Sequence, residues 1–141
     1  MTDFSELLNK GRIKQGRFSR KQIKDRLDIA RRDLEAARNN LDTNPEWAYI
    51  IAYNAMHQAG RAYLFKKGFR TVGKGHHATV VQFIKLDLGP DYAALLAVMD
   101  RMRRNRNRAT YDEVGTISES EARTAVISAE EFVEKISDIL R

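Results

Sequence analysis

Apolar residues recur at helical spacing over most of the chain, and the clearest stripe lies between residues 20 and about 41. Its apolar positions follow one another at steps of three and four, with lysine and arginine on the other faces: Ile23, Leu27, Ala30, Leu34, Ala37 and Leu41. This spacing predicts a helix with one buried face. Ser19 stands where a helix N-cap is expected.

The segment from residue 45 to about 67 is apolar on nearly every side, with alanines between its large residues. A helix without a polar face is normally central in a fold, so we expect this one to contact several neighbours. Pro45 suits its first turn. We interpret its aromatic residues as core or dimer-interface residues rather than base-stacking platforms: Tyr49, Tyr53, Tyr63 and Phe65.

Three more helices are predicted further along the chain. The glycine-rich segment 68–75 indicates a loop, which leads to a helix over about 76–86. A second helix is expected from Pro90 to about residue 108, and a third from about 118 to 140, where Ser118 and Glu121 fit a capping box. No segment of four or more residues alternates with period two, so no strand is predicted.

These elements predict an all-α fold of four or five helices, in which four main helices form an up-and-down bundle and a short N-terminal helix is peripheral. Residues 1–18 form an N-terminal arm or short helix in this interpretation. Residues 19–141 form a single helical bundle. A chain of 141 residues with 43% hydrophobic residues has room for one domain with one core.

Composition narrows the chemistry. The chain has no cysteine, which excludes disulfides, a thiol nucleophile, a thiolate zinc site and an iron–sulfur cluster. Neither a signal peptide nor an apolar run of about 20 residues is present, so we expect a soluble cytoplasmic protein with no membrane partner. The net charge of +6 favours a polyanionic partner such as nucleic acid.

The positive charge is densest between residues 101 and 108, where five of eight residues are arginine: Arg101, Arg103, Arg104, Arg106 and Arg108. At about 100° per residue, Arg106 lies within about 20° of Leu95 and Met99. Arg103 lies within about 20° of Leu96. These two arginines therefore continue the apolar stripe of their helix, and the other three point elsewhere.

An arginine on a buried face needs an anionic or carbonyl partner, because an unpaired buried charge is costly. Arg103 and Arg106, with Asn107 beside them, would line a groove suited to phosphate, to which guanidinium donates two hydrogen bonds. Two alternatives stay open. The arginines pair with acids of the last helix such as Glu131 or Glu134, or they form a solvated helix end.

Three segments of the chain resemble one known family. The run Arg-Asn-Arg-Ala-Thr-Tyr-Asp at 106–112 resembles the Arg-Asn-x-Ala-x-Tyr signature of HEPN domains, the higher eukaryotes and prokaryotes nucleotide-binding family. Residues 53–64 with the glycine turn 67–70 resemble the second helix of that family. Residues 75–81 resemble the start of its third helix. The resemblance covers most of the chain from about residue 20 to 140.

The resemblance implies a helical bundle, usually a homodimer, that binds RNA or nucleotides near the paired signature helices. Many members of the family are metal-independent ribonucleases in toxin–antitoxin, defence or RNA-processing systems, and others partner a minimal nucleotidyltransferase. In the ribonucleases an Arg-x4-His motif acts at the scissile phosphate. Here the arginine aligns as Arg106, but Tyr111 stands where the histidine is expected.

That replacement bears on catalysis because cleavage of RNA without a metal needs a group that titrates near neutrality, as histidine does. Tyrosine, with a reference pKa near 10, is a poor base at pH 7, although it donates hydrogen bonds to phosphate. A substitute would have to be His57, His76 or His77. We interpret His57 as a hydrogen-bonded core residue. The other two histidines begin a helix, where anions bind, or they cap it.

Three hypotheses follow. The first is a binding module that holds RNA or a nucleotide through Arg103, Arg106, Asn107 and Tyr111, with Arg101, Arg104 and Arg108 around them and His76 and His77 as further binding residues. The second is a metal-independent endoribonuclease with Arg106, Asn107 and Tyr111 as catalytic residues, or with a histidine of the His76–His77 pair. The third is an interaction protein without a nucleic-acid ligand.

Partners and cofactors follow from the same hypotheses. The resemblance implies a homodimer and a nucleotidyltransferase or antitoxin as protein partner. No cofactor is predicted. No metal site is predicted either, since two adjacent histidines without a third ligand at suitable spacing are weak evidence for one.

Overall fold

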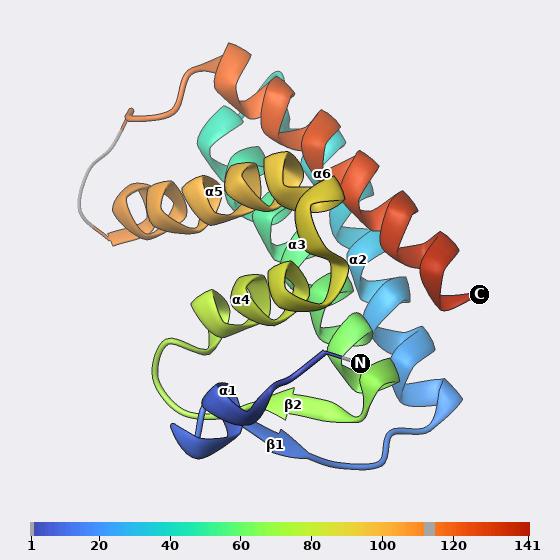
Figure 1. Cartoon of the computed structure of the whole chain (residues 1–141). Helices are drawn as coiled ribbons and strands as arrows, with labels where there is room; N and C mark the ends of the chain where they lie inside the picture. The colour runs from blue at the N-terminus through green and yellow to red at the C-terminus, as the bar shows by residue number, and fades with distance from the viewer. Residues whose placement is uncertain (1, 112–114) are drawn as a thin grey trace.

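The computed structural model describes residues 2–111 and 115–141, with the side chains of 109–111 left aside. Its elements in chain order are α1 (Ser5–Asn9), β1 (Ile13–Gln15), α2 (Arg20–Asn40), α3 (Pro45–Lys67), β2 (Phe69–Thr71), α4 (His76–Leu88), the 3-10 turn η1 (Gly89–Tyr92), α5 (Ala93–Tyr111) and α6 (Glu119–Leu140). The fold is an all-α helical bundle, as predicted. Figure 1 shows α2, α3 and α6 running alongside one another, with α4 and α5 lying across them.

Helix α3 is the centre of the core. It packs most extensively against α2 and α6, and it also contacts α4 and α5. Tyr49, Tyr53 and Tyr63 on this helix are buried, which confirms their interpretation as core residues. Phe65 is only partly buried and stacks on Phe18, with ring centroids 4.1 Å apart.

The helix starts agree with the sequence at four of five places, including α4, which begins at His76 as predicted. Ser19 and Ser118 each form a complete capping box, with Gln22 and Glu121 respectively. Pro45 occupies the first turn of α3, behind an Asn44 N-cap. Pro90, expected to start a helix, lies in the first turn of the 3-10 helix η1, and the α-helix itself begins later than expected, at Ala93.

The N-terminal residues require two corrections. Strands β1 and β2 pair antiparallel, with Ile13 opposite Thr71, although no strand was predicted. Three-residue strands are too short to produce a recognisable alternation. The segment is also less peripheral than expected, because Leu7 and Ile13 are buried and Phe4 stacks on Phe83 at 4.1 Å.

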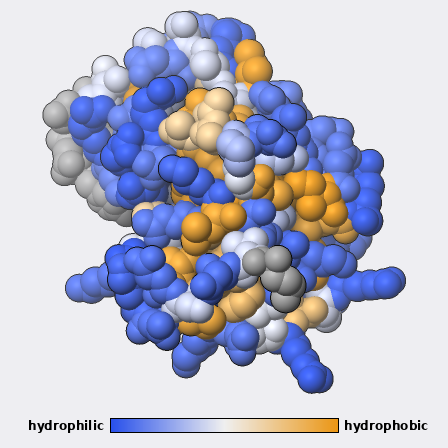
Figure 2. All heavy atoms as spheres, viewed as in Figure 1, coloured by the Kyte–Doolittle hydropathy of each residue, from blue (hydrophilic) through white to orange (hydrophobic). Residues whose placement is uncertain are grey.

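The surface is largely hydrophilic on the face shown in Figure 2, with apolar side chains gathered where α4 and α5 meet. Among the described residues, no helix combines the length and the apolar character needed to cross a bilayer. On this face, apolar and hydrophilic side chains therefore lie side by side in the region between α4 and α5.

Candidate phosphate-binding cleft and histidine cluster

The arginines of α5 differ in burial as their helical phase predicts. Arg103 and Arg106 are partly buried, whereas Arg101, Arg104 and Arg108 are exposed. The apolar residues of the same stripe, Leu96 and Met99, are fully buried. Along this stripe the buried apolar residues are therefore followed by two partly buried arginines, whose guanidinium groups lie nearer the surface.

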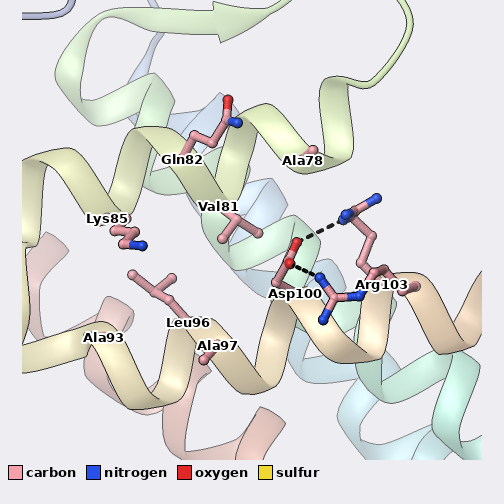
Figure 3. Close-up of a pocket in the computed structure, with 10 residues that line it drawn as sticks. Ala78, Val81, Gln82, Lys85, Ala93, Leu96, Ala97, Asp100 and Arg103 are labelled. Carbon is pink, nitrogen blue, oxygen red and sulfur yellow. Dashed lines mark hydrogen bonds and ion pairs between the residues drawn. The ribbon is translucent and has the colours of Figure 1, made fainter.

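Two of these arginines share one carboxylate. Asp100 Oδ1 accepts from Arg103 Nε at 3.0 Å, and Asp100 Oδ2 accepts from Arg104 at 2.5 Å (Figure 3). A single carboxylate leaves one of the two positive charges uncompensated. Within the described residues neither Arg103 nor Arg106 forms an ion pair with Glu131 or Glu134, the acids considered as their partners, and the partner of Glu131 is Lys135 at 4.0 Å.

A cleft of about 370 Å³ opens between α4 and α5 beside this ion pair. Figure 3 shows Val81 of α4 and Leu96 of α5 between the two helices, with Lys85 beside Leu96 and with Asp100 and Arg103 farther along α5. Lys85, Arg103 and Arg104 supply three positive charges against the one negative charge of Asp100. The cleft therefore combines an apolar floor with a cationic rim, an arrangement suited to an anionic ligand.

Arg106 lies one turn beyond Arg103, over the ring of Tyr53. Its Cζ is 5.9 Å from the ring centroid, and its NH1 donates to Asn107 Oδ1 at 3.2 Å. Its Nε is buried and has no hydrogen-bond partner among the described residues. Burial raises the pKa of Tyr53, against the opposing effect of Arg106 and Arg103, so the phenol stays protonated.

Tyr53 connects this arginine to a cluster of histidines. The hydroxyl oxygen of Tyr53 lies 2.7 Å from His77 Nδ1. The ring of His77 stacks on that of His57, with centroids 3.8 Å apart and planes 9° from parallel. His76 lies edge-on to His57, with centroids 5.7 Å apart. Two elements, α3 and the first turn of α4, thus bring the three histidines of the chain together.

Burial controls the charge of this cluster. Desolvation, together with the neighbouring histidines, holds the pKa of His57 far below its usual value. Desolvation also lowers the pKa of His77 to about 4, with further contributions from His76, Arg106 and Arg103. Both rings are therefore neutral at pH 7. His57 is buried as expected, but the expectation of a hydrogen bond is not met at Nδ1, which has no partner among the described residues.

The remaining predicted residues are more scattered. Arg101 lines a different pocket, between α3, α5 and α6, beside Tyr49 and Asn105. Arg108 is exposed and donates to Asn105 Oδ1 at 2.8 Å. The side chain of Tyr111 lies outside the described residues. The structure thus brings Arg103, Arg106, His76 and His77 into one region, with Arg104 at its edge.

Sequence reasoning did not connect several other members of this region. Tyr53 and His57 are four residues apart and share one face of α3, a spacing that was readable from the sequence. Gln82 and Lys85 are likewise three residues apart on α4. Asp100 directly precedes the arginine cluster in the sequence, but that position alone does not show which arginines it pairs with. That α3, α4 and α5 converge here depends on tertiary packing, which spacing within each helix does not reveal.

The fold and the cleft define a small all-helical domain with a cationic cleft between two of its helices. The family model of the HEPN domain matches residues 23–139, and the chain belongs to this family. The resemblance inferred from the three sequence segments is thereby confirmed.

Two solved structures share the fold. The crystal structure of ST0689, an archaeal HEPN homologue, is 19% identical, covers 85% of this chain and 98% of its own, and has a TM-score of 0.66. That of TT1696 from Thermus thermophilus is 20% identical, covers 83% of this chain and 97% of its own, and has a TM-score of 0.64. No curated protein matches the chain.

Proposed function

We propose that this HEPN domain binds the phosphate groups of RNA or of a nucleotide at the α4–α5 cleft and the adjoining Arg106. The observation that carries the proposal is the excess of guanidinium over carboxylate. Arg103 and Arg104 share Asp100, and Arg106 has a buried Nε without a partner among the described residues. A phosphate oxygen would satisfy that group and compensate the surplus charge.

Family membership supports the same proposal, since RNA and nucleotides are the ligands that the sequence resemblance implies. The histidines at the start of α4 extend the binding region toward Arg106. Exposed Arg101 and Arg108 would add to the positive field that attracts a polyanion without touching the cleft. In this proposal the domain is a homodimer that acts in a toxin–antitoxin or defence system or beside a nucleotidyltransferase.

Fluorescence anisotropy of a labelled single-stranded RNA, measured at several salt concentrations, tests the proposal. Arg106→Ala should weaken binding at least several-fold and flatten the plot of log affinity against log salt by roughly 0.7 for each lost phosphate contact. The matched control is Arg32→Ala on α2, an exposed arginine whose helix packs on α3 and α6. Calorimetry with ATP and AMP distinguishes a nucleotide site from an RNA site.

Equal affinities for wild type and Arg106→Ala, or negligible affinity of wild type for RNA and nucleotides alike, would contradict the proposal. Light scattering gives the mass of the particle in solution. A monomeric mass would exclude the homodimer.

One observation favours metal-independent RNA cleavage as a second candidate function. His77 bonds to the Tyr53 hydroxyl, and Arg106 lies over the same tyrosine ring, so a neutral histidine and an arginine flank one side chain. A neutral imidazole accepts a proton, as activation of a 2′-hydroxyl requires, but a pKa of about 4 makes His77 a weak base, so we expect any such cleavage to be slow. RNA incubated with the protein in EDTA should be cut by wild type and not by Arg106→Ala or His77→Gln. Intact RNA in every sample would exclude this candidate.

A further inference from the structure

The histidine cluster has the composition of a transition-metal site. His57 comes from the middle of α3, and His76 and His77 open α4. Each offers one ring nitrogen, and these nitrogens all lie within 4.8 Å of one another. Around a tetrahedral zinc ion with Zn–N bonds of about 2.1 Å, neighbouring ligand atoms are roughly 3.4 Å apart. The widest separation therefore has to shrink by up to roughly 1.4 Å, a shift within the reach of side-chain rotation.

Two features suit these side chains to ligation. His57 is 5% exposed, yet its Nδ1 is buried without a partner among the described residues. Unpaired buried polar atoms are uncommon and costly, and a bound ion would satisfy this one. The Tyr53 hydroxyl holds His77 through Nδ1, which leaves Nε2 for an ion. Histidine ligands in proteins are commonly held in this way through the second ring nitrogen.

We propose that His57, His76 and His77 bind one first-row divalent metal ion, of the class of Zn²⁺ or Co²⁺. Three imidazoles leave a fourth position for water or an oxyanion, as in open zinc sites. The proposal does not require RNA or nucleotide binding, although His76 and His77 also border the proposed binding region.

Two properties of the cluster limit how tightly an ion is held. The guanidinium of Arg106 lies 5.9 Å from the centroid of the Tyr53 ring, near His57 and His77, and its positive charge repels a divalent cation. The rings of His57 and His77 are stacked face to face, and stacked parallel rings keep their in-plane nitrogen lone pairs in separate planes, so these cannot meet at one ion. Binding must therefore rotate the two rings apart, so we expect weaker affinity than in closed four-ligand sites.

Cobalt titration of EDTA-treated, dialysed protein tests the site. Wild type should bind one Co²⁺ per chain, develop the visible absorption of tetrahedral cobalt, and lose it on addition of Zn²⁺. His76→Asn should weaken binding about 10–100-fold or more, since it removes one ligand. His76 is the least buried of the three histidines, so this variant is the one expected to fold normally, which circular dichroism checks. The chain holds only these three histidines and no cysteine, so no other imidazole or thiolate can produce the spectrum.

Arg106→Ala distinguishes this proposal from the proposed function. Removal of a nearby positive charge should tighten Co²⁺ binding while it weakens RNA binding. Absence of a cobalt spectrum in wild type, or equal Co²⁺ affinity of wild type and His76→Asn, would overturn the metal site whatever the RNA result. Conversely, a normal cobalt spectrum together with unchanged RNA affinity in Arg106→Ala would overturn only the proposed function.

Discussion

At the scale of single residues, the partly buried carboxylate of Asp87 connects three segments of the chain. Its oxygens accept hydrogen bonds from the hydroxyls of Thr2 and Tyr63, and Lys67 Nζ lies 3.4 Å away. Burial raises the pKa of this carboxyl, but the hydrogen bonds and Lys67 outweigh burial and leave the pKa below its usual value. Asp87 thus joins the N-terminal residues, α3 and α4 at one point.

We expect Asp87→Ala to lower the free energy of unfolding by about 1–3 kcal/mol, because it leaves the buried hydroxyl of Tyr63 without a hydrogen-bond acceptor. Tyr63 is 1% exposed, so that hydroxyl has little access to water. Urea unfolding measures the loss, with exposed Asp91→Ala as the control. Adding Tyr63→Phe removes the unpaired hydroxyl. The loss of unfolding free energy in the double variant should therefore be smaller than the sum of the losses in the two single variants. Strict additivity would contradict this role.

The histidines make stability depend on pH. Histidine in the unfolded chain titrates near 6.5, whereas burial lowers the pKa of both His57 and His77 in the folded protein. Between these values the unfolded state binds more protons, so the free energy of unfolding should fall as the pH drops from about 6.5 toward 5. Urea unfolding in EDTA at pH 7.5, 6 and 5 checks this. His77→Gln should show a shallower decline, and an unchanged decline would count against the assignment.

The helical phase of the arginines was the part of the site that could be predicted from the sequence. Helical phase alone selected Arg103 and Arg106 from five arginines, because exposure on an isolated helix follows its period. The pairing of His57 with His77 was not accessible in the same way. It depends on how α4 crosses α3, and no spacing within either helix encodes that crossing.

At the scale of elements, a glycine sets how closely α4 approaches α3. A Cβ added at Gly60 would lie 2.5 Å from Val80 Cγ1 and 3.3 Å from Ile84 Cδ1. Both neighbours are fully buried, so they have little freedom to move. The same approach brings the first turn of α4 against His57. The sequence predicted that this helix is apolar on all sides, but it did not show which face requires a residue without a side chain.

We expect Gly60→Ala to destabilise the protein by about 1–3 kcal/mol through overpacking. This exceeds the gain of up to about 1 kcal/mol that alanine brings to a helix. Thermal unfolding measures the change. Val80→Ala should rescue part of the loss when combined with Gly60→Ala, while it is destabilising alone. A Gly60→Ala protein as stable as wild type would show that α4 shifts at little cost.

At the scale of the whole molecule, the bundle and its N-terminal segment share one core. Phe4 contacts Phe83 of α4 and Phe69 of β2, with ring centroids 4.1 and 5.3 Å apart. Leu7 and Ile13 are buried, and β1 closes the small sheet against β2. The helix pattern located the bundle correctly, but it gave no sign of this packing because the arm's apolar residues are few and lack a helical or strand period.

A chain that begins at Ser19 should therefore be markedly less stable than the full chain. Each of Phe4, Leu7 and Ile13 contributes on the order of 1.5–3 kcal/mol by burial, and the three together approach the roughly 5–15 kcal/mol that typically separates folded from unfolded domains. We expect a lower melting temperature and stronger binding of a hydrophobic dye, since Phe69 and Phe83 lose their cover. Phe4→Ala tests the same contact within the full chain, and exposed Arg12→Ala is its control. If the shortened chain and Phe4→Ala both melt at the wild-type temperature, the bundle folds independently of residues 1–18. If both melt at a lower temperature in a single transition, residues 1–18 and the bundle unfold as one cooperative unit.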